Sequence, residues 1–121
     1  MIEIPVSLGE LYDKFSILEI KKQKGLDVEK ELNLLKEKLL LTEDTNRIAG
    51  SFYACLKTVN TLLWDIEDDK RQHEADQDFG ETFIELARLV YILNDHRALL
   101  KKHINKYSNS EITEEKKHSE Y

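Results

Sequence analysis

Polar side chains interrupt the helical stripes of this chain at positions where apolar residues are expected. In the middle of the chain, Asn60, Trp64, Glu67 and Arg71 are spaced by four, three and four residues, which places them on one side of a helix. Charged and amide groups cost free energy to bury unless they are paired. The pattern therefore indicates either a buried ion-pair network or a binding site, and the sequence leaves both interpretations open.

A second polar group follows later in the chain. Asn94, Arg97 and Lys101 continue a helical stripe whose first half is apolar. If the two helices pair antiparallel, Asn60 and Trp64 are the expected neighbours of Asn94 and Arg97. The predicted ligand-binding residues are Lys14, Asn60, Trp64, Asn94, Arg97 and Lys101.

The two interpretations divide between these residues. Glu67 and Arg71 lie one turn apart and are expected to pair within their own helix, whereas the helix that carries Arg97 and Lys101 offers them no carboxylate at that spacing. We therefore favour a paired network for the first two residues and an anion site for the other two. Glu67 and Arg71 are expected nearer the turn that connects the two long helices than Arg97 and Lys101 are. The four residues can therefore meet in one pocket only if the first helix contributes to it.

Carboxylates on facing helices also raise the possibility of a metal-dependent nucleotide hydrolase, and the best candidates are Glu67, Asp68, Glu85 and Asp95. The match to the all-α nucleotide pyrophosphohydrolases is poor. Those enzymes show Glu-x-x-Glu followed by Glu-x-x-Asp, whereas Glu85 is followed three residues later by an arginine and not by an aspartate. The chain has no Gly-x-Ser-x-Gly motif, P-loop or dinucleotide fingerprint. The sequence therefore assigns no catalytic residue, no metal ligand and no cofactor, and it leaves open whether the protein is an enzyme.

Length and composition restrict the class of protein. A chain of 121 residues is long enough for one domain with its own core, and its net charge of −6 with mixed signs argues against nucleic acid as a partner. The single cysteine excludes an intramolecular disulfide bond. The longest apolar run, residues 89–93, is far shorter than the ~20 residues of a membrane helix, and the start lacks a signal peptide. These features predict a soluble cytoplasmic protein without membrane association.

Helix is the only periodicity that the apolar residues support. Ser7 and Glu10 have capping-box spacing and begin a predicted helix at about residues 7–24, which Gly25 ends. Asp27 is the predicted cap of a second helix of about 14 residues. We expect more than about two-thirds of the residues to be helical.

Two longer helices follow. One continues to about Gln72 and carries Cys55 on its apolar stripe, where we expect a small buried side chain, and the other spans about residues 80–107. The fold class is therefore all-α, a helical bundle of two long antiparallel helices with the two shorter N-terminal helices laid along them. Residues 1–107 form the predicted single domain, and residues 108–121 form a polar C-terminal tail. The predicted core residues are Leu11, Phe15, Leu18, Leu32, Leu35, Phe52, Leu56, Val59, Leu63, Ile66, Leu86, Val90, Leu93 and Leu100.

Five segments carry a resemblance to a known family. They are residues 5–22, which begin Pro-Val-Ser-Leu-Gly-Glu-Leu-Tyr-Asp-Lys, residues 59–68 with Val-Asn-Thr-Leu-Leu-Trp-Asp-Ile-Glu-Asp, residues 83–88 with Phe-Ile-Glu-Leu-Ala-Arg, residues 94–105, which begin Asn-Asp-His-Arg, and Glu-Glu-Lys at 114–116. In content and order they resemble DUF6165, a family of small bacterial and phage proteins of unknown function. Lys70 departs from the family pattern, where a hydrophobic residue is expected. The resemblance implies one domain over nearly the whole chain, and it implies no activity.

The functional prediction is a binding or assembly module. The alternative is a helical-bundle enzyme that acts on a phosphorylated or anionic small molecule. The expected partners are a second copy of the chain, because two long helices flanked by shorter ones leave part of an apolar stripe uncovered, and an anionic small molecule.

Overall fold

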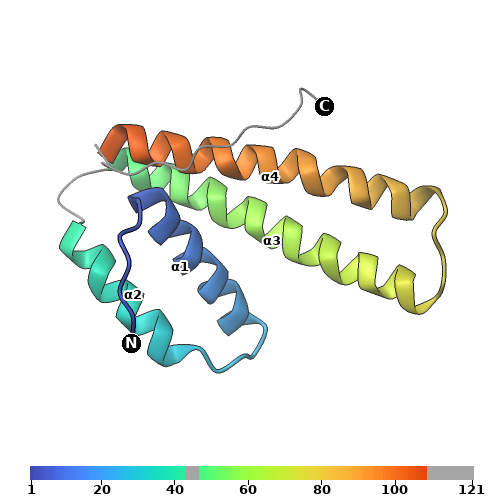
Figure 1. Ribbon diagram of the computed structural model, residues 1–121, viewed down its shortest axis with the longest axis horizontal. Coiled ribbons are helices and arrows are strands. Elements are labelled where there is room, and N and C mark those ends of the chain that lie inside the picture. The colour runs from blue at the N-terminus through green and yellow to red at the C-terminus, as the bar shows by residue number, and fades with distance from the viewer. Residues whose placement is uncertain (43–46, 109–121) are drawn as a thin grey trace.

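The computed structural model describes residues 1–42 and 47–108, and these residues form four α-helices with no strand among them (Figure 1). The structure is 83% helical, which confirms the prediction of an all-α fold. The helices are α1 (Leu8–Gln23), α2 (Glu29–Thr42), α3 (Arg47–Ala75) and α4 (Glu81–Ser108). No helix in the described ranges combines the length and the apolar character that crossing a membrane requires. Except for Ser108, the predicted tail lies outside the described residues.

The ends of α1 follow the sequence signals. The Ser7 side chain accepts a hydrogen bond from the Glu10 backbone amide at 3.1 Å, as an N-cap does. At the other end Gly25 has a φ of +87°, and the amides of Gly25 and Leu26 donate to carbonyls of the last turn. The predicted start of α2 is slightly early, because the helix begins at Glu29 and its cap position is therefore one residue beyond Asp27.

The four helices form two hairpins (Figure 1). The long helices α3 and α4 run antiparallel, as predicted, and α1 lies obliquely across one end of their hairpin. The prediction that both short helices lie along the long hairpin is wrong for α2, which packs mainly on α1. The reason is that α2 buries only Leu32 and Leu39, and α1 alone can cover so short an apolar stripe.

The position of α1 divides the long hairpin into two parts. We call α3 residues 52–66 and α4 residues 94–105 the covered end, because α1 contacts both helices there. We call α3 residues 67–75 and α4 residues 81–93 the open end, where, among the described helices, each long helix packs mainly against the other. The boundary lies near Asp65, whose carboxylate is 3.4 Å from the ammonium of Lys24, just beyond the last turn of α1.

Burial follows this division. Among the predicted core residues, Leu11, Leu18, Leu32, Leu56 and Ile66 are buried, and the other nine are half-buried. Since a two-helix pair cannot enclose a stripe on every side, residues such as Leu86 and Val90 keep partial contact with water. Cys55 is exposed, contrary to prediction. Its neighbour Leu56 is buried, but Cys55 lies on a different face of α3, which the other described helices leave exposed.

Candidate functional site

The first turn of α1 touches the last turns of α4 through a glycine. The Gly9 amide donates a hydrogen bond to Oδ1 of Asn105 at 2.7 Å, and both residues are buried. A Cβ atom at position 9 would lie 2.6 Å from the backbone oxygen of Lys101, closer than real Cβ contacts. Glycine is therefore required for the two backbones to approach, and this approach brings the next turn of α1 against α3 and α4.

Asp13 lies at the centre of the resulting contact between three helices and is only 1% exposed. Arg97 of α4 binds its carboxylate with two nitrogens, through Nε at 2.8 Å and through Nη2. From α3, Nδ2 of Asn60 donates to Asp13 Oδ1 at 2.9 Å and approaches Oγ of Ser16 at 2.7 Å. The buried carboxylate of α1 thus binds a guanidinium from α4 and an amide from α3, and the same amide donates to the Ser16 hydroxyl of α1.

These partners keep Asp13 ionised. Burial alone would raise the pKa of this carboxyl, because it disfavours the charged form. The hydrogen bonds from Arg97 and Asn60, together with the charges of Arg97 and Lys101, outweigh that effect and hold the pKa of Asp13 below its ordinary value. The carboxylate and the guanidinium therefore form a true ion pair at neutral pH.

A second ion pair lies one turn closer to the start of α1. The ammonium of Lys101 is buried and lies 2.7 Å from Oε2 of Glu10. The same carboxylate is 3.6 Å from the ammonium of Lys14, which is exposed. Lys14 and Lys101 therefore share one carboxylate on the side of α1 that faces the end of α4.

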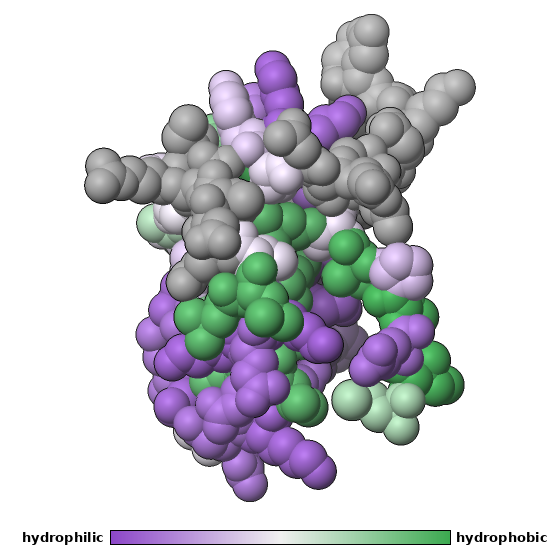
Figure 2. All heavy atoms as spheres, turned by 90° about the vertical axis from the view of Figure 1, so that its left-hand side faces the viewer, coloured by the Kyte–Doolittle hydropathy of each residue, from purple (hydrophilic) through white to green (hydrophobic). Residues whose placement is uncertain are grey.

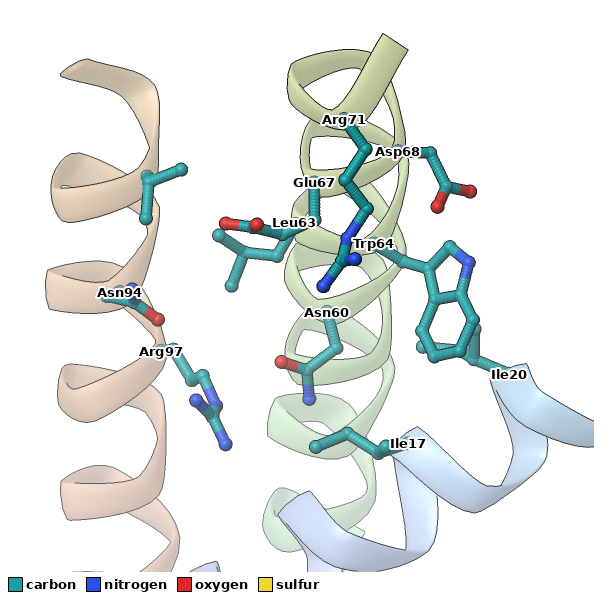
Figure 3. Close-up of a pocket in the computed structure, with 11 residues that line it drawn as sticks. Ile17, Ile20, Asn60, Leu63, Trp64, Glu67, Asp68, Arg71, Asn94 and Arg97 are labelled. Carbon is teal, nitrogen blue, oxygen red and sulfur yellow. The ribbon is translucent and has the colours of Figure 1, made fainter. Parts of the chain in front are cut away.

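Beyond Asp13, toward the open end, the helices separate and leave a cleft of about 490 Å³ (Figure 3). Ile17 and Ile20 of α1 line it on one side, and Val90 and Asn94 of α4 line it on the other. Arg97 lies at its base, where the ion pair with Asp13 closes the space between the helices. The α3 residues that line it are Asn60, Leu63, Trp64, Glu67, Asp68 and Arg71.

Arg71 is the cation of this cleft that lies farthest from α1. Its side chain points along α3 into the cleft, toward Asn60, in Figure 3. Within the described ranges no carboxylate lies at ion-pair distance from it. The predicted pair between Glu67 and Arg71 is not formed, because Glu67 turns toward α4 and lies 3.5 Å from the ammonium of Lys70 instead.

The structure brings four of the six predicted ligand-binding residues into this cleft, namely Asn60, Trp64, Asn94 and Arg97. It places Lys14 and Lys101 outside the cleft, at Glu10. The network and the site are therefore neighbours rather than alternatives, since Arg97 pairs with a carboxylate behind it and also lines the cleft in front. That these residues bind a ligand stays a prediction.

Sequence reasoning missed Asp13 and Ser16. Their signal is a second stripe on α1, in which Gly9, Asp13, Ser16 and Ile20 follow at intervals of four, three and four residues beside the leucine seam. All four are buried, because α1 packs against α2 on one side and against the long hairpin on another. A helix that shows two buried stripes lies inside the bundle, and its small and acidic residues then become candidates for contacts between helices.

The carboxylates considered for a metal centre do not gather. Glu67 and Asp68 line the cleft, whereas Glu85 and Asp95 do not. Across residues 1–42 and 47–108, no three histidine, cysteine or acidic side chains lie close enough together to hold a metal ion. The structure therefore gives no support to the hydrolase alternative.

Comparison with known proteins identifies the family. The model of the family of unknown function DUF6165 matches residues 2–120, so the chain belongs to that family, as the resemblance of its segments suggested. No curated protein and no solved structure matches the chain.

Proposed function

We propose that this member of the DUF6165 family is a small-molecule binding module whose ligand places an anionic group in the cleft between Arg71 and Arg97. The observation that carries the proposal is the side chain of Arg71, which points into the cleft and has no described carboxylate at ion-pair distance. A guanidinium prefers a bidentate carboxylate or phosphate partner, so an arginine held in a cleft without one is suited to bind that group from a ligand.

Arg97 complements Arg71 as a fixed donor. Asp13 binds Nε and Nη2 of the Arg97 guanidinium, and Arg97 also lines the cleft at its base. The side chain is 31% exposed, so Arg97 contributes to the polar surface of the cleft. Because the buried carboxylate already fixes the orientation of Arg97, binding a ligand costs little of its side-chain freedom.

The shape of the cleft fits a small molecule. Its volume of about 490 Å³ lies within the roughly 300–1,000 Å³ that is usual for ligand pockets. Leu63, Trp64 and Val90 supply apolar walls, and Asn94 supplies an amide that can fix the orientation of a polar group. Binding sites for small ligands likewise combine apolar surface with polar groups that fix the orientation of the ligand.

Trp64 provides a direct test, because it lines the cleft and is the single tryptophan of the chain. We expect inorganic phosphate or adenosine monophosphate to change the fluorescence of Trp64 in a saturable manner. The variant Arg71→Gln should weaken this binding by roughly 10- to 100-fold, which corresponds to about 1.5–3 kcal/mol for a hydrogen bond to a charged group.

Arg88→Gln is the matched control. Arg88 is an exposed arginine of α4 that does not line the cleft, so its removal changes the net charge equally and should leave the titration unchanged. Equal weakening by both variants would show a general charge effect and would contradict the proposal. Absence of any saturable response to either anion in the parent protein would contradict it as well.

We also propose that the protein assembles as a homodimer. The support is the number of large apolar side chains left in contact with water, including Leu41 of α2 at 80% exposed and Ile4 of the N-terminal segment at 69%. Seen from the covered end, hydrophobic residues gather in patches between strongly hydrophilic ones (Figure 2). Light scattering should give twice the monomer mass of 14.2 kDa, and a monomeric mass at tens of micromolar would contradict this proposal.

A further inference from the structure

We infer that the ligand of the cleft is zwitterionic, with an ammonium group as well as an anionic group. The inference rests on the proposed function and adds the charge of the second ligand group. Its basis is the set of charges that line the cleft, in which Arg71 is accompanied by Glu67 and Asp68 from the same stretch of α3.

The charges at the two ends of the cleft differ. At the base, the positive charge of Arg97 is balanced by Asp13. Near the open end, two carboxylates and the single guanidinium of Arg71 line the cleft. A ligand that carries only negative charge would therefore gain from Arg71 while it is repelled by Glu67 and Asp68. A ligand that also carries an ammonium group would convert that repulsion into attraction.

The geometry places the two signs close together. Glu67 and Arg71 are one helical turn apart, which corresponds to a rise of about 6 Å along α3. In Figure 3 the carboxylate of Glu67 extends toward α4, whereas the guanidinium of Arg71 extends toward Asn60, so the two groups meet different parts of the cleft. One small molecule can then place an ammonium group near Glu67 and an anionic group near the two arginines at the same time.

The present partner of Glu67 does not oppose this arrangement. Lys70 lies 3.5 Å from Glu67 across an exposed contact, and Lys70 does not line the cleft. Such exposed pairs are weak, and the carboxylate has two oxygens that accept several hydrogen bonds. Glu67 can therefore accept a hydrogen bond from a ligand ammonium, and the carboxylate of Asp68, which points away from α4, adds negative charge on the other side of α3 (Figure 3).

Between the charged groups the cleft is apolar. Leu63 of α3 and Val90 of α4 line it together with Ile17 of α1. A carbon skeleton that joins the two charged groups can pack against these side chains. The ligand class that matches the charges and the apolar surface together is an aliphatic or aromatic amino acid, in the broad sense of a molecule with one amine and one acid group.

The test compares molecules that share a skeleton but differ in charge. Leucine is compared with 4-methylpentanoate, which lacks the amine, and with 3-methylbutylamine, which lacks the acid. A second series with a larger charge separation consists of 6-aminohexanoate, hexanoate and hexylamine. Binding is followed by the fluorescence of Trp64, and we expect at least one zwitterion to bind tenfold or more tightly than its anionic counterpart.

Variants identify the groups responsible. The double variant Glu67→Gln with Asp68→Asn should remove the preference for the zwitterion while it leaves anion binding equal or tighter. Arg71→Gln should weaken the zwitterion and the anion alike. Glu85→Gln is the control for the acidic residues, because Glu85 is exposed on α4 outside the cleft.

The outcomes separate this inference from the proposed function. If the anions bind as tightly as the zwitterions in both series, or if phosphate binds and no zwitterion does, the ligand is a simple anion, and the inference is wrong while the proposed function stands. If the amines alone bind, or if none of the probes binds, both are wrong. A preference for the zwitterion that survives the double variant would also overturn the inference, because the carboxylates would then not be its cause.

Discussion

The covered and open ends of the long hairpin are built from the same two helices, yet some charged residues are buried and paired at the covered end, whereas those at the open end stay in contact with water. At the covered end, Asp13 and Lys101 are buried, and each has an oppositely charged partner. At the open end, no described acidic or arginine side chain is buried, and Arg71 points into a cleft. The difference arises from one element, because α1 packs against the first part of the hairpin and diverges before the second.

Arg97 and Arg71 show what the comparison teaches. Both are arginines beside the apolar stripe of a long helix, and their sequence surroundings predicted the reverse of what is found, because Glu67 lies one turn before Arg71 whereas Arg97 has no such carboxylate on its own helix. Arg97 lies where α1 supplies a buried carboxylate, whereas the α1 residues that line the cleft with Arg71, Ile17 and Ile20, are apolar. Whether a charged residue stabilises the fold or remains available for a ligand is therefore decided by the third helix and not by the helix that carries it.

The largest expected effect distinguishes these two arginines. Arg97→Ala leaves the buried Asp13 carboxylate without its ion-pair partner and should lower the free energy of unfolding by about 3–5 kcal/mol. Arg71→Ala removes no ion pair with a described residue and should change stability by no more than about 0.5 kcal/mol. Urea unfolding of the two variants measures both values. Similar losses for both would show that the open end also depends on paired charges, and the comparison would fail.

A second test uses two isoleucines of α4. Ile104 is 0% exposed at the covered end, whereas Ile84 is 56% exposed at the open end. Ile104→Ala should cost about 2–5 kcal/mol because it removes a fully buried side chain and leaves a cavity. Ile84→Ala should cost no more than about 0.5 kcal/mol, as is usual for surface positions. A large loss for Ile84→Ala in thermal or urea unfolding would reveal a partner that covers this side chain in solution.

Two glycines allow a sharper test of the close contact at the covered end. Gly9→Ala places a Cβ 2.6 Å from the Lys101 carbonyl oxygen and should destabilise the protein by about 1–3 kcal/mol through overpacking. A Cβ at position 50 of α3 would meet no atom within 4 Å apart from the neighbouring backbone of its own helix, so Gly50→Ala should stabilise the protein by roughly 0.5–1 kcal/mol, because alanine favours the helix. Melting temperatures that move in the same direction for both variants would contradict the close approach of α1 and α4.

The smallest effect is expected from pH. Because the pKa of Asp13 is lower in the folded protein than in the unfolded chain, its contribution to stability is fully present above the unfolded pKa near 3.8. That contribution is lost as the pH falls through the lower folded pKa. The parent should therefore lose stability more steeply below about pH 4 than Asp13→Asn does, which is measured by urea unfolding across that range. Parallel curves for the two proteins would show that the pKa of Asp13 does not change on folding.

The sequence predicted individual helices better than their arrangement. Ser7 and Gly25 mark the ends of α1 through local backbone requirements, so their signals can be read without knowledge of the fold. The pairing of Asn60 and Arg97 with Asp13 could not be predicted in the same way, because it joins residues 47 and 84 positions apart. The only sequence signal for this pairing is the second stripe of α1. It was overlooked because the leucine seam of the same helix is the stronger apolar pattern.

The hydrogen bond between Gly9 and Asn105 has a consequence for the order of folding. It joins residues 96 positions apart, so α1 leaves the ribosome before α4 and can dock on α4 only after that helix has been synthesised. Contacts between such distant parts of a chain form late, since the intervening chain must first lose its conformational freedom. During synthesis, α1 can therefore pack against α2 and α3 before α4 is complete, and the Asp13 carboxylate lacks its ion-pair partner until Arg97 has been synthesised.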